Sequence, residues 1–209
     1  MPAPPAPLLV DLLREALARG EPVSLVVASD SMRPLLRRGD RVIIAPVVAA
    51  DLERGDLVTL HDGSPSGSLL THRYYGQIAS VPPLLVTRGD RVLRFDAPAS
   101  PERLIGRVLA RQRGGHTLSL LGGPGAALNS RLGALACDEV RRVTGRALSV
   151  SMDKAEYDTL AALAAANAGR LSVRVYRRWL RWRAAGLARG ARGVPDDAAR
   201  SLELKEVHV

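Results

Sequence analysis

Between residues 21 and 113 the sequence alternates short β-rich apolar runs with clusters of glycine, proline, serine and aspartate. The runs are PVSLVVAS, DRVIIAPV, DLVTL, PPLLVT and LIGRVLARQ. Apolar runs separated at this spacing by turn-forming residues are typical of antiparallel sheets. The pattern therefore predicts a mostly antiparallel β core over residues 21–114, and this core is the strongest constraint on the fold.

Helical patterns flank this core on both sides. Near the N-terminus, PLLVDLLREALARG places leucine and alanine at helical spacing and ends in glycine, so we expect an amphipathic helix within residues 1–20. After the core we expect a helix around 126–143, an alanine-rich helix closed by Gly169, and a basic helix over 172–189. The expected fold is mainly β, α+β overall, with a helical and basic C-terminal extension over 115–209.

The tripeptide Arg-Gly-Asp occurs three times, and its aspartates are Asp40, Asp56 and Asp90. An adhesion role is disfavoured, because the sequence has no secretory features. Glycine permits the backbone conformation of a turn, and aspartate accepts hydrogen bonds from neighbouring backbone N–H groups. We interpret the three repeats as turns that lead into strands.

The chain carries 30 basic and 21 acidic residues, a formal net charge of +9, and its only lysines are Lys154 and Lys205. This balance suggests affinity for nucleic acid or anionic lipid. The single cysteine, Cys137, excludes an internal disulfide, and no Cys/His spacing resembles a zinc site, so we expect no metal or cofactor. The N-terminus does not read as a signal peptide and no apolar run is long enough for a transmembrane helix, so the cytosol is the default compartment.

Ser31 lies in SDSMRP, a polar stretch that follows an apolar run and that Pro34 constrains. A serine nucleophile needs a sharply turned backbone, a base within hydrogen-bond reach, a group that orients the base, and donors for the developing oxyanion. Neither lysine falls in the β core, so we look for the base among the histidines. His72, in SLLTHRYYG, suits a strand side chain that enters a partly buried site, and imidazole exchanges protons near neutral pH. Taken singly, the two residues also fit a turn serine and a structural histidine.

Six blocks of sequence occur in order: SDSMRP, RRGDRV, RGDLVTL, THRYYG, TRGDRVLRFD and LIGRV. Together they resemble the type I signal peptidase superfamily, and more narrowly its archaeal and endoplasmic-reticulum branch, in which histidine replaces the catalytic lysine. The resemblance covers roughly residues 22–110, about half of the chain. It implies a β core like that of signal peptidases and repressor autoproteases, and a serine endopeptidase that uses serine, histidine and aspartate.

The resemblance implies a role for each matched residue. Ser31 matches the nucleophile, His72 matches the general base, and Asp96 matches the acid that orients the imidazole. Asp90 matches a supporting acid. Ser29 matches the serine whose hydroxyl joins the backbone N–H of Ser31 as an oxyanion donor.

The loop around the nucleophile also departs from the family pattern. Met32 and Pro34 match residues that shape the loop and contact substrate. Asp30 replaces the usual glycine between the two serines, Leu35 stands where threonine is common, and the membrane anchor of ordinary signal peptidases is missing. These departures leave open an altered substrate or a loss of activity.

The leading hypothesis is a serine endopeptidase, which by its resemblance to the family binds an extended peptide along a sheet edge. By resemblance, it cleaves a leader, pro-segment or signal-peptide-like segment after small residues. A DNA-binding autoproteolytic regulator is a weaker hypothesis, because about twenty residues before the β core are too few for a helix-turn-helix and the catalytic lysine is missing. A catalytically silent peptide-binding or scaffold protein of the same fold is the third.

The basic helix predicted over 172–189 places Trp179 and Trp182 among the arginines from Arg174 to Arg183. The arginines are consistent with a solvated surface. They are also consistent with peripheral contact with an anionic membrane, where tryptophan lies at the interface and arginine meets the headgroups. Nucleic acid is the weaker partner, and the sequence leaves the oligomeric state open.

Overall fold

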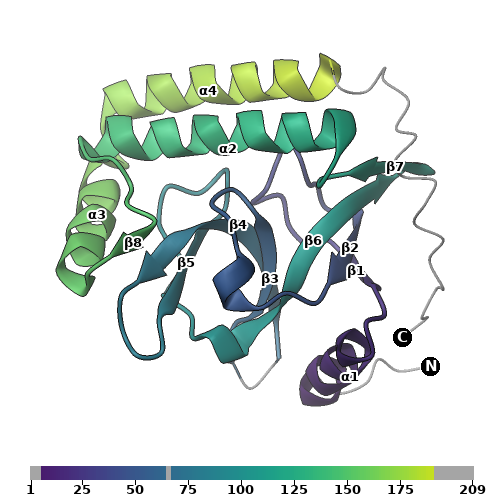
Figure 1. Ribbon diagram of the computed structural model, residues 1–209. Helices are drawn as coiled ribbons and strands as arrows, with labels where there is room; N and C mark the ends of the chain where they lie inside the picture. The colour runs from purple at the N-terminus through teal and green to yellow at the C-terminus, as the bar shows by residue number, and fades with distance from the viewer. Residues whose placement is uncertain (1–5, 65–66, 191–209) are drawn as a thin grey trace.

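A mostly antiparallel eight-stranded sheet forms the centre of the computed structural model, which describes residues 6–64 and 67–190 (Figure 1). Six strands follow the order β1-β2-β6-β3-β4-β5, while β7 pairs with β6 and β8 pairs in parallel with β4. The strands are β1 (Val23–Val26), β2 (Arg41–Ala45), β3 (Leu57–His61), β4 (Leu69–Ile78), β5 (Leu84–Arg88), β6 (Leu104–Arg113), β7 (His116–Ser119) and β8 (Ser151–Met152). The predicted α+β class with a β core is confirmed.

Four α-helices surround the sheet, close to the positions that the sequence predicts. They are α1 (Ala6–Ala18), α2 (Gly123–Thr144), α3 (Lys154–Asn167) and α4 (Leu171–Gly190), and two short 3₁₀ helices are η1 (Ala49–Asp51) and η2 (Pro101–Arg103). The Asp153 side chain caps α3 by accepting a hydrogen bond from the Glu156 backbone N–H at 2.7 Å. The extension over 115–209 is not purely helical, because β7 and β8 join the sheet.

The C-terminal helices share their cores with the sheet. In Figure 1, α2 runs across one side of the sheet, α4 lies along α2, and α1 lies at the far end beside β1 and β6. One apolar cluster joins Leu13 of α1 and Ile44 of β2 to Leu128 of α2. A second joins Tyr75 of β4 to α2 and to Leu160 of α3. Aliphatic side chains therefore form most of the core, as expected for a chain in which aromatic residues are only 3%.

The first two Arg-Gly-Asp repeats form the turns that the sequence predicts. Gly39 and Gly55 have φ of +86° and +104°, a region that favours glycine. Asp40 and Asp56 each accept a hydrogen bond from the backbone N–H three residues earlier, at 2.7 and 3.0 Å. Strands β2 and β3 begin directly after these turns.

The third repeat is different, and its interpretation as a strand-entry turn is wrong. Gly89 has no left-handed φ, and it follows the end of β5 instead of leading into a strand. Asp90 bonds to an arginine side chain and not to the local backbone. The same tripeptide therefore adopts two conformations, because different tertiary partners are available to its aspartate.

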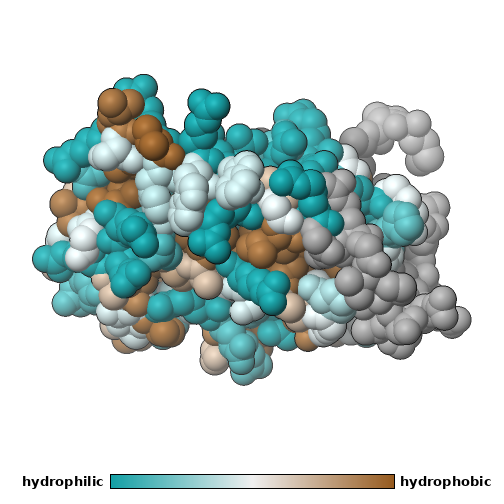
Figure 2. Space-filling model, turned by 90° about the horizontal axis from the view of Figure 1, so that it is seen from above, coloured by the Kyte–Doolittle hydropathy of each residue, from teal (hydrophilic) through white to brown (hydrophobic). Residues whose placement is uncertain are grey.

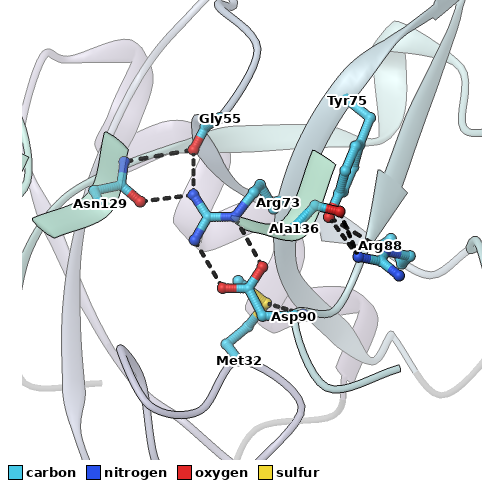
Figure 3. Close-up of polar contacts among 8 residues, drawn as sticks. All are labelled: Met32, Gly55, Arg73, Tyr75, Arg88, Asp90, Asn129 and Ala136. Carbon is cyan, nitrogen blue, oxygen red and sulfur yellow. Dashed lines mark hydrogen bonds and ion pairs between the residues drawn. The ribbon is translucent and has the colours of Figure 1, made fainter. Parts of the chain in front are cut away.

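A buried ion pair ties the sheet to the helical layer. Arg88 at the end of β5 is fully buried and lies 2.8 Å from Glu139 of α2. Its guanidinium also donates to the Tyr75 hydroxyl at 3.0 Å and to the Ala136 carbonyl at 3.2 Å (Figure 3). Arg177 of α4 donates to the second oxygen of Glu139 at 2.8 Å. Glu139 thus neutralises charge from a strand and from a helix at a buried position.

Glu139→Ala is expected to lower the free energy of unfolding by about 3–5 kcal/mol, because it leaves a buried guanidinium without its counter-charge. Urea denaturation followed by circular dichroism measures this change. Asp158→Ala, which removes the partner of exposed Lys154 on α3, is the matched control and should cost only about 0.5 kcal/mol. Equal losses in the two variants would contradict a dominant role for the buried pair.

Candidate active site

The loop that carries Ser31 follows β1 and is held by hydrogen bonds to the segment after β5. Met32 is 1% exposed, and its sulfur accepts a hydrogen bond from the Asp90 backbone N–H at 3.3 Å. The Ser31 carbonyl accepts another from the Arg91 backbone N–H at 2.8 Å. The loop is therefore held against the segment that follows β5. Of the residues predicted to contact substrate, Met32 is buried in the core, while Pro34 lines an open groove.

His72 on β4 lies beside Ser31, although the two residues are far apart in the sequence. The His72 Nε2 atom is 2.9 Å from the Ser31 hydroxyl oxygen, within hydrogen-bond distance. His72 is 5% exposed, and its backbone pairs with Val58 of the neighbouring strand β3. A central strand therefore holds the imidazole in place.

Asp96 completes a chain of hydrogen-bonding groups with His72 and Ser31. One Asp96 oxygen lies 2.7 Å from His72 Nδ1 and also accepts a hydrogen bond from the Thr87 hydroxyl at 2.8 Å. The Tyr157 hydroxyl of α3 donates to the Asp96 carbonyl at 3.0 Å. A carboxylate at Nδ1 favours the tautomer that carries its proton there, which leaves Nε2 free to accept the serine proton.

Asp90 lies near this chain but bonds elsewhere. Its two oxygens accept hydrogen bonds from Arg73 Nε at 2.8 Å and from Arg73 Nη2 at 2.7 Å (Figure 3). Arg73 is fully buried and also donates to the Gly55 carbonyl and to the Asn129 side chain, both at 2.7 Å. Burial opposes the charge of Arg73, but Asp90 outweighs it and raises the pKa of the guanidinium. Asp90 therefore holds Arg73, the residue that directly follows His72, and does not contact His72 itself.

The two serines of SDSM converge at one point. The Ser29 hydroxyl oxygen lies 3.1 Å from the Ser31 hydroxyl oxygen, and the Ser31 backbone N–H points to the Ser29 hydroxyl with an N···O distance of 3.5 Å. The Ser31 N–H thus donates to the Ser29 hydroxyl, and both groups lie next to the Ser31 side chain. A hydroxyl and a backbone N–H are the types of donor that oxyanion sites use.

Asp30 bonds within its own loop and not to the hydroxyl of Ser31. Its carboxylate accepts hydrogen bonds from the Arg38 backbone N–H at 3.1 Å and from the Arg33 side chain at 3.2 Å. The hydrogen bond from Arg38 is the main reason that the pKa of Asp30 is lowered, and the charge of Arg33 adds to it. The Asp30 side chain therefore links two parts of its own loop, and its hydrogen-bond partners lie outside the Ser31–His72–Asp96 chain.

Gly89 is part of the site, although the sequence interpretation treated it as a turn residue. A Cβ atom at this position would lie 2.9 Å from His72 Nε2 and 3.1 Å from the Ser31 Cβ. The backbone of Gly89 is not left-handed, so any residue could adopt its conformation. Glycine is needed here because a side chain would collide with His72 and Ser31. A glycine directly before a matched acid was the only sequence signal for this role.

One edge of β4 is open beside His72. The residues from Leu69 to His72 pair with β3, whereas β5 pairs with β4 only from Arg73 onward. Among the described residues, no other strand pairs with the free edge of that first half of β4. An open edge next to a serine and a histidine can accept an extended peptide as an additional strand.

Within residues 6–64 and 67–190, no three histidine, cysteine, aspartate or glutamate side chains are grouped to hold a metal ion. In the same part of the chain, every helix is too short or too polar to span a bilayer.

Comparison of the chain with protein-family models, with curated proteins and with solved structures found no match.

Gly89→Ala is expected to push His72 and Ser31 apart and to reduce Ser31 reactivity about a hundredfold, because displacement of reacting groups by about 1 Å has this order of effect. The rate of labelling by a fluorophosphonate probe measures it. Gly169→Ala, at a position where a Cβ meets open space, is the control and should label as the wild type does. Unchanged labelling of Gly89→Ala in a folded protein would contradict the crowding.

Proposed function

We propose that the chain is a serine endopeptidase with Ser31 as nucleophile, His72 as general base and Asp96 as the acid that orients the imidazole. The observation that carries the proposal is the continuous hydrogen-bonding chain from the Ser31 hydroxyl through both His72 nitrogens to the Asp96 carboxylate. The resemblance of the sequence blocks to type I signal peptidases supports the same assignment.

The chemistry follows from this geometry. His72 Nε2 removes the proton from the Ser31 hydroxyl as the oxygen attacks the scissile carbonyl carbon. Asp96 stabilises the imidazolium. The Ser31 N–H and the Ser29 hydroxyl exchange their mutual hydrogen bond for hydrogen bonds to the carbonyl oxygen as it gains negative charge. The imidazolium then protonates the departing amine, and a water molecule, activated by the same histidine, hydrolyses the acyl-enzyme.

The substrate in this proposal is an extended peptide that pairs with the free edge of β4. The edge from Leu69 to Thr71 ends at His72, so a strand added there lies beside the reacting groups. Cleavage after small residues, in a leader, pro-segment or signal-peptide-like segment, comes from the family resemblance. A catalytically silent peptide-binding protein is the second candidate, because the same open edge binds a peptide without any chemistry.

We further propose that α4 brings the protein, in the cytosol, to an anionic membrane surface. Four apolar side chains on α4 are exposed: Leu171 by 73%, Val175 by 61%, Trp179 by 43% and Trp182 by 68%. Their spacing of four, four and three residues places them on one side of the helix. The buried side of α4 carries Leu180 and Ala188, so the exposed stripe is a separate face.

Charge on α4 supports a membrane as the partner of this stripe. Arg174, Arg178 and Arg183 are exposed on the same helix, and the Arg183 guanidinium lies 5.0 Å from the centre of the Trp179 ring. Figure 2 looks down on the side of the molecule that α4 covers in Figure 1, and it shows apolar surface between hydrophilic side chains. Exposed tryptophan beside arginine is typical of helices that lie in the headgroup region of a bilayer.

Ser31→Ala and His72→Ala are expected to abolish labelling by a fluorophosphonate probe, because the first removes the nucleophile and the second removes its base. Gel fluorescence of the labelled protein is the measurement, with Ser172→Ala on α4 as the control that keeps labelling. A folded wild-type protein that neither labels nor cleaves a peptide library between about pH 6 and 9 would favour the silent alternative.

Trp179→Ala/Trp182→Ala is expected to reduce binding to phosphatidylglycerol vesicles by about tenfold or more, since each indole buries apolar surface at the interface. Co-sedimentation measures the bound fraction. Val48→Ala/Val150→Ala, which removes exposed apolar side chains outside α4, is the control. Absence of binding by the wild type, or equal binding to neutral phosphatidylcholine vesicles, would rule out the anionic membrane as partner.

A further inference from the structure

A groove of about 370 Å³ runs between the nucleophile loop, the segment after β5, and helices α2 and α4. Its floor is apolar and comes from both helices, with Leu132, Leu135, Leu180 and Ala184 among the lining residues. Most of the other lining residues are arginines, and we refer to the groove as the arginine groove.

The arginine groove carries more positive than negative charge. Its arginines come from three parts of the chain: Arg33 and Arg37 from the loop, Arg91 from the segment after β5, and Arg177 and Arg181 from α4. Its acids are already paired, Asp90 with Arg73 and Glu139 with Arg88 and Arg177.

Two guanidiniums in the groove form no direct ion pair within the described part of the chain. The side chains of Arg91 and Arg181 form no hydrogen bond or ion pair with any described residue. Burial lowers the pKa of Arg181, the charges of Arg177 and Arg91 lower it further, and the charge of Glu139 opposes them only in part. An anion between these arginines would relieve the repulsion.

The arginine groove also meets the candidate active site. Arg33 and Pro34, which line it, follow Ser31 within three residues. The Arg91 backbone N–H donates to the Ser31 carbonyl at 2.8 Å, so the arginine at the groove and the nucleophile lie on bonded segments. A ligand in the groove therefore touches the same loop that presents the serine.

We propose that the arginine groove is a secondary binding site for an acidic segment of the peptide substrate, with carboxylates on the arginines and apolar side chains on the leucine floor. This inference rests on the proposed peptidase function. The arginines stand on both the loop and α4, which suits several carboxylates spaced along a chain. A single lipid headgroup would instead need them gathered at one end.

Direct binding to Ser31→Ala tests the proposal without any need for cleavage. The probe is a short fluorescein-labelled peptide of glutamate and leucine, compared with the same peptide containing glutamine, by fluorescence polarisation. We expect Arg181→Gln to weaken binding of the acidic peptide by about threefold to fivefold, and added salt to weaken it further. We also expect Arg91→Gln/Arg181→Gln to weaken it by more than about tenfold.

Arg189→Gln, on the same helix but not among the residues that line the groove, removes the same charge and is the matched control. Equal binding of the acidic and glutamine peptides, or equal effects of Arg181→Gln and Arg189→Gln, would overturn the proposal. Binding of dodecanoate with this arginine dependence, in the absence of peptide binding, would overturn it in favour of a lipid site.

The two failures are distinguishable. If the wild type is inert toward peptides and the probe while Ser31→Ala binds the acidic peptide through Arg181, only the catalytic proposal fails. If the wild type cleaves peptides, an acidic segment added to a substrate should lower KM about threefold to fivefold with kcat unchanged, because the contact is the same in ground and transition states. If the wild type cleaves peptides and the acidic segment leaves KM unchanged, the groove proposal is wrong and the catalytic proposal stands.

Discussion

The buried ion pair between Arg73 and Asp90 is the interaction on which the site depends. Arg73 directly follows His72, and Asp90 directly follows Gly89, so the pair fixes the distance between β4 and the end of β5. Arg73 also bonds to the turn at Gly55 and to Asn129 of α2 (Figure 3). The buried Arg73 guanidinium tolerates little movement of these partners. Loss of any of them leaves a buried N–H group unpaired, and loss of Asp90 also leaves a buried charge uncompensated.

The helical layer supports the same region from above. Tyr157 of α3 bonds to the backbone of Asp96, and Arg177 of α4 donates to the Arg91 carbonyl at 2.7 Å. Glu139 of α2 joins α4 to the end of β5. The helices after the β core thus cover the sheet and also hold in place the segment that carries Asp90 and Asp96. They also form one wall of the arginine groove, which links the candidate chemistry to the candidate recognition surface.

Several features were predictable from the sequence because they depend on neighbours in the chain. The alternation of apolar runs and turn residues predicted strands β1, β2, β3, β5 and β6, but not β7, which lies in the region expected to be helical. Helical spacing predicted the four helices to within a few residues. The first two Gly-Asp turns depend on local backbone and were predicted correctly. The third failed, because the partner of Asp90 is a side chain 17 residues earlier in the chain, and no local pattern encodes that contact. Strand β8 is only two residues long and is defined by its pairing with β4. Two residues are too few to show the alternation of apolar and polar side chains that predicts a strand.

The sequence by itself determined which side chains are available for chemistry and in what order: Ser31, then His72, then Asp96, with Ser29 and Asp90 beside them. Only the tertiary structure decided that His72 lies 2.9 Å from Ser31 and 2.7 Å from Asp96, that Asp90 pairs with Arg73, and that Asp30 bonds to Arg33 and Arg38. It also decided that Gly89 must be small, because two strands and a loop converge there. The reason is physical: residue types and local turns are properties of the chain, whereas distances between strands are set by packing and by buried charge.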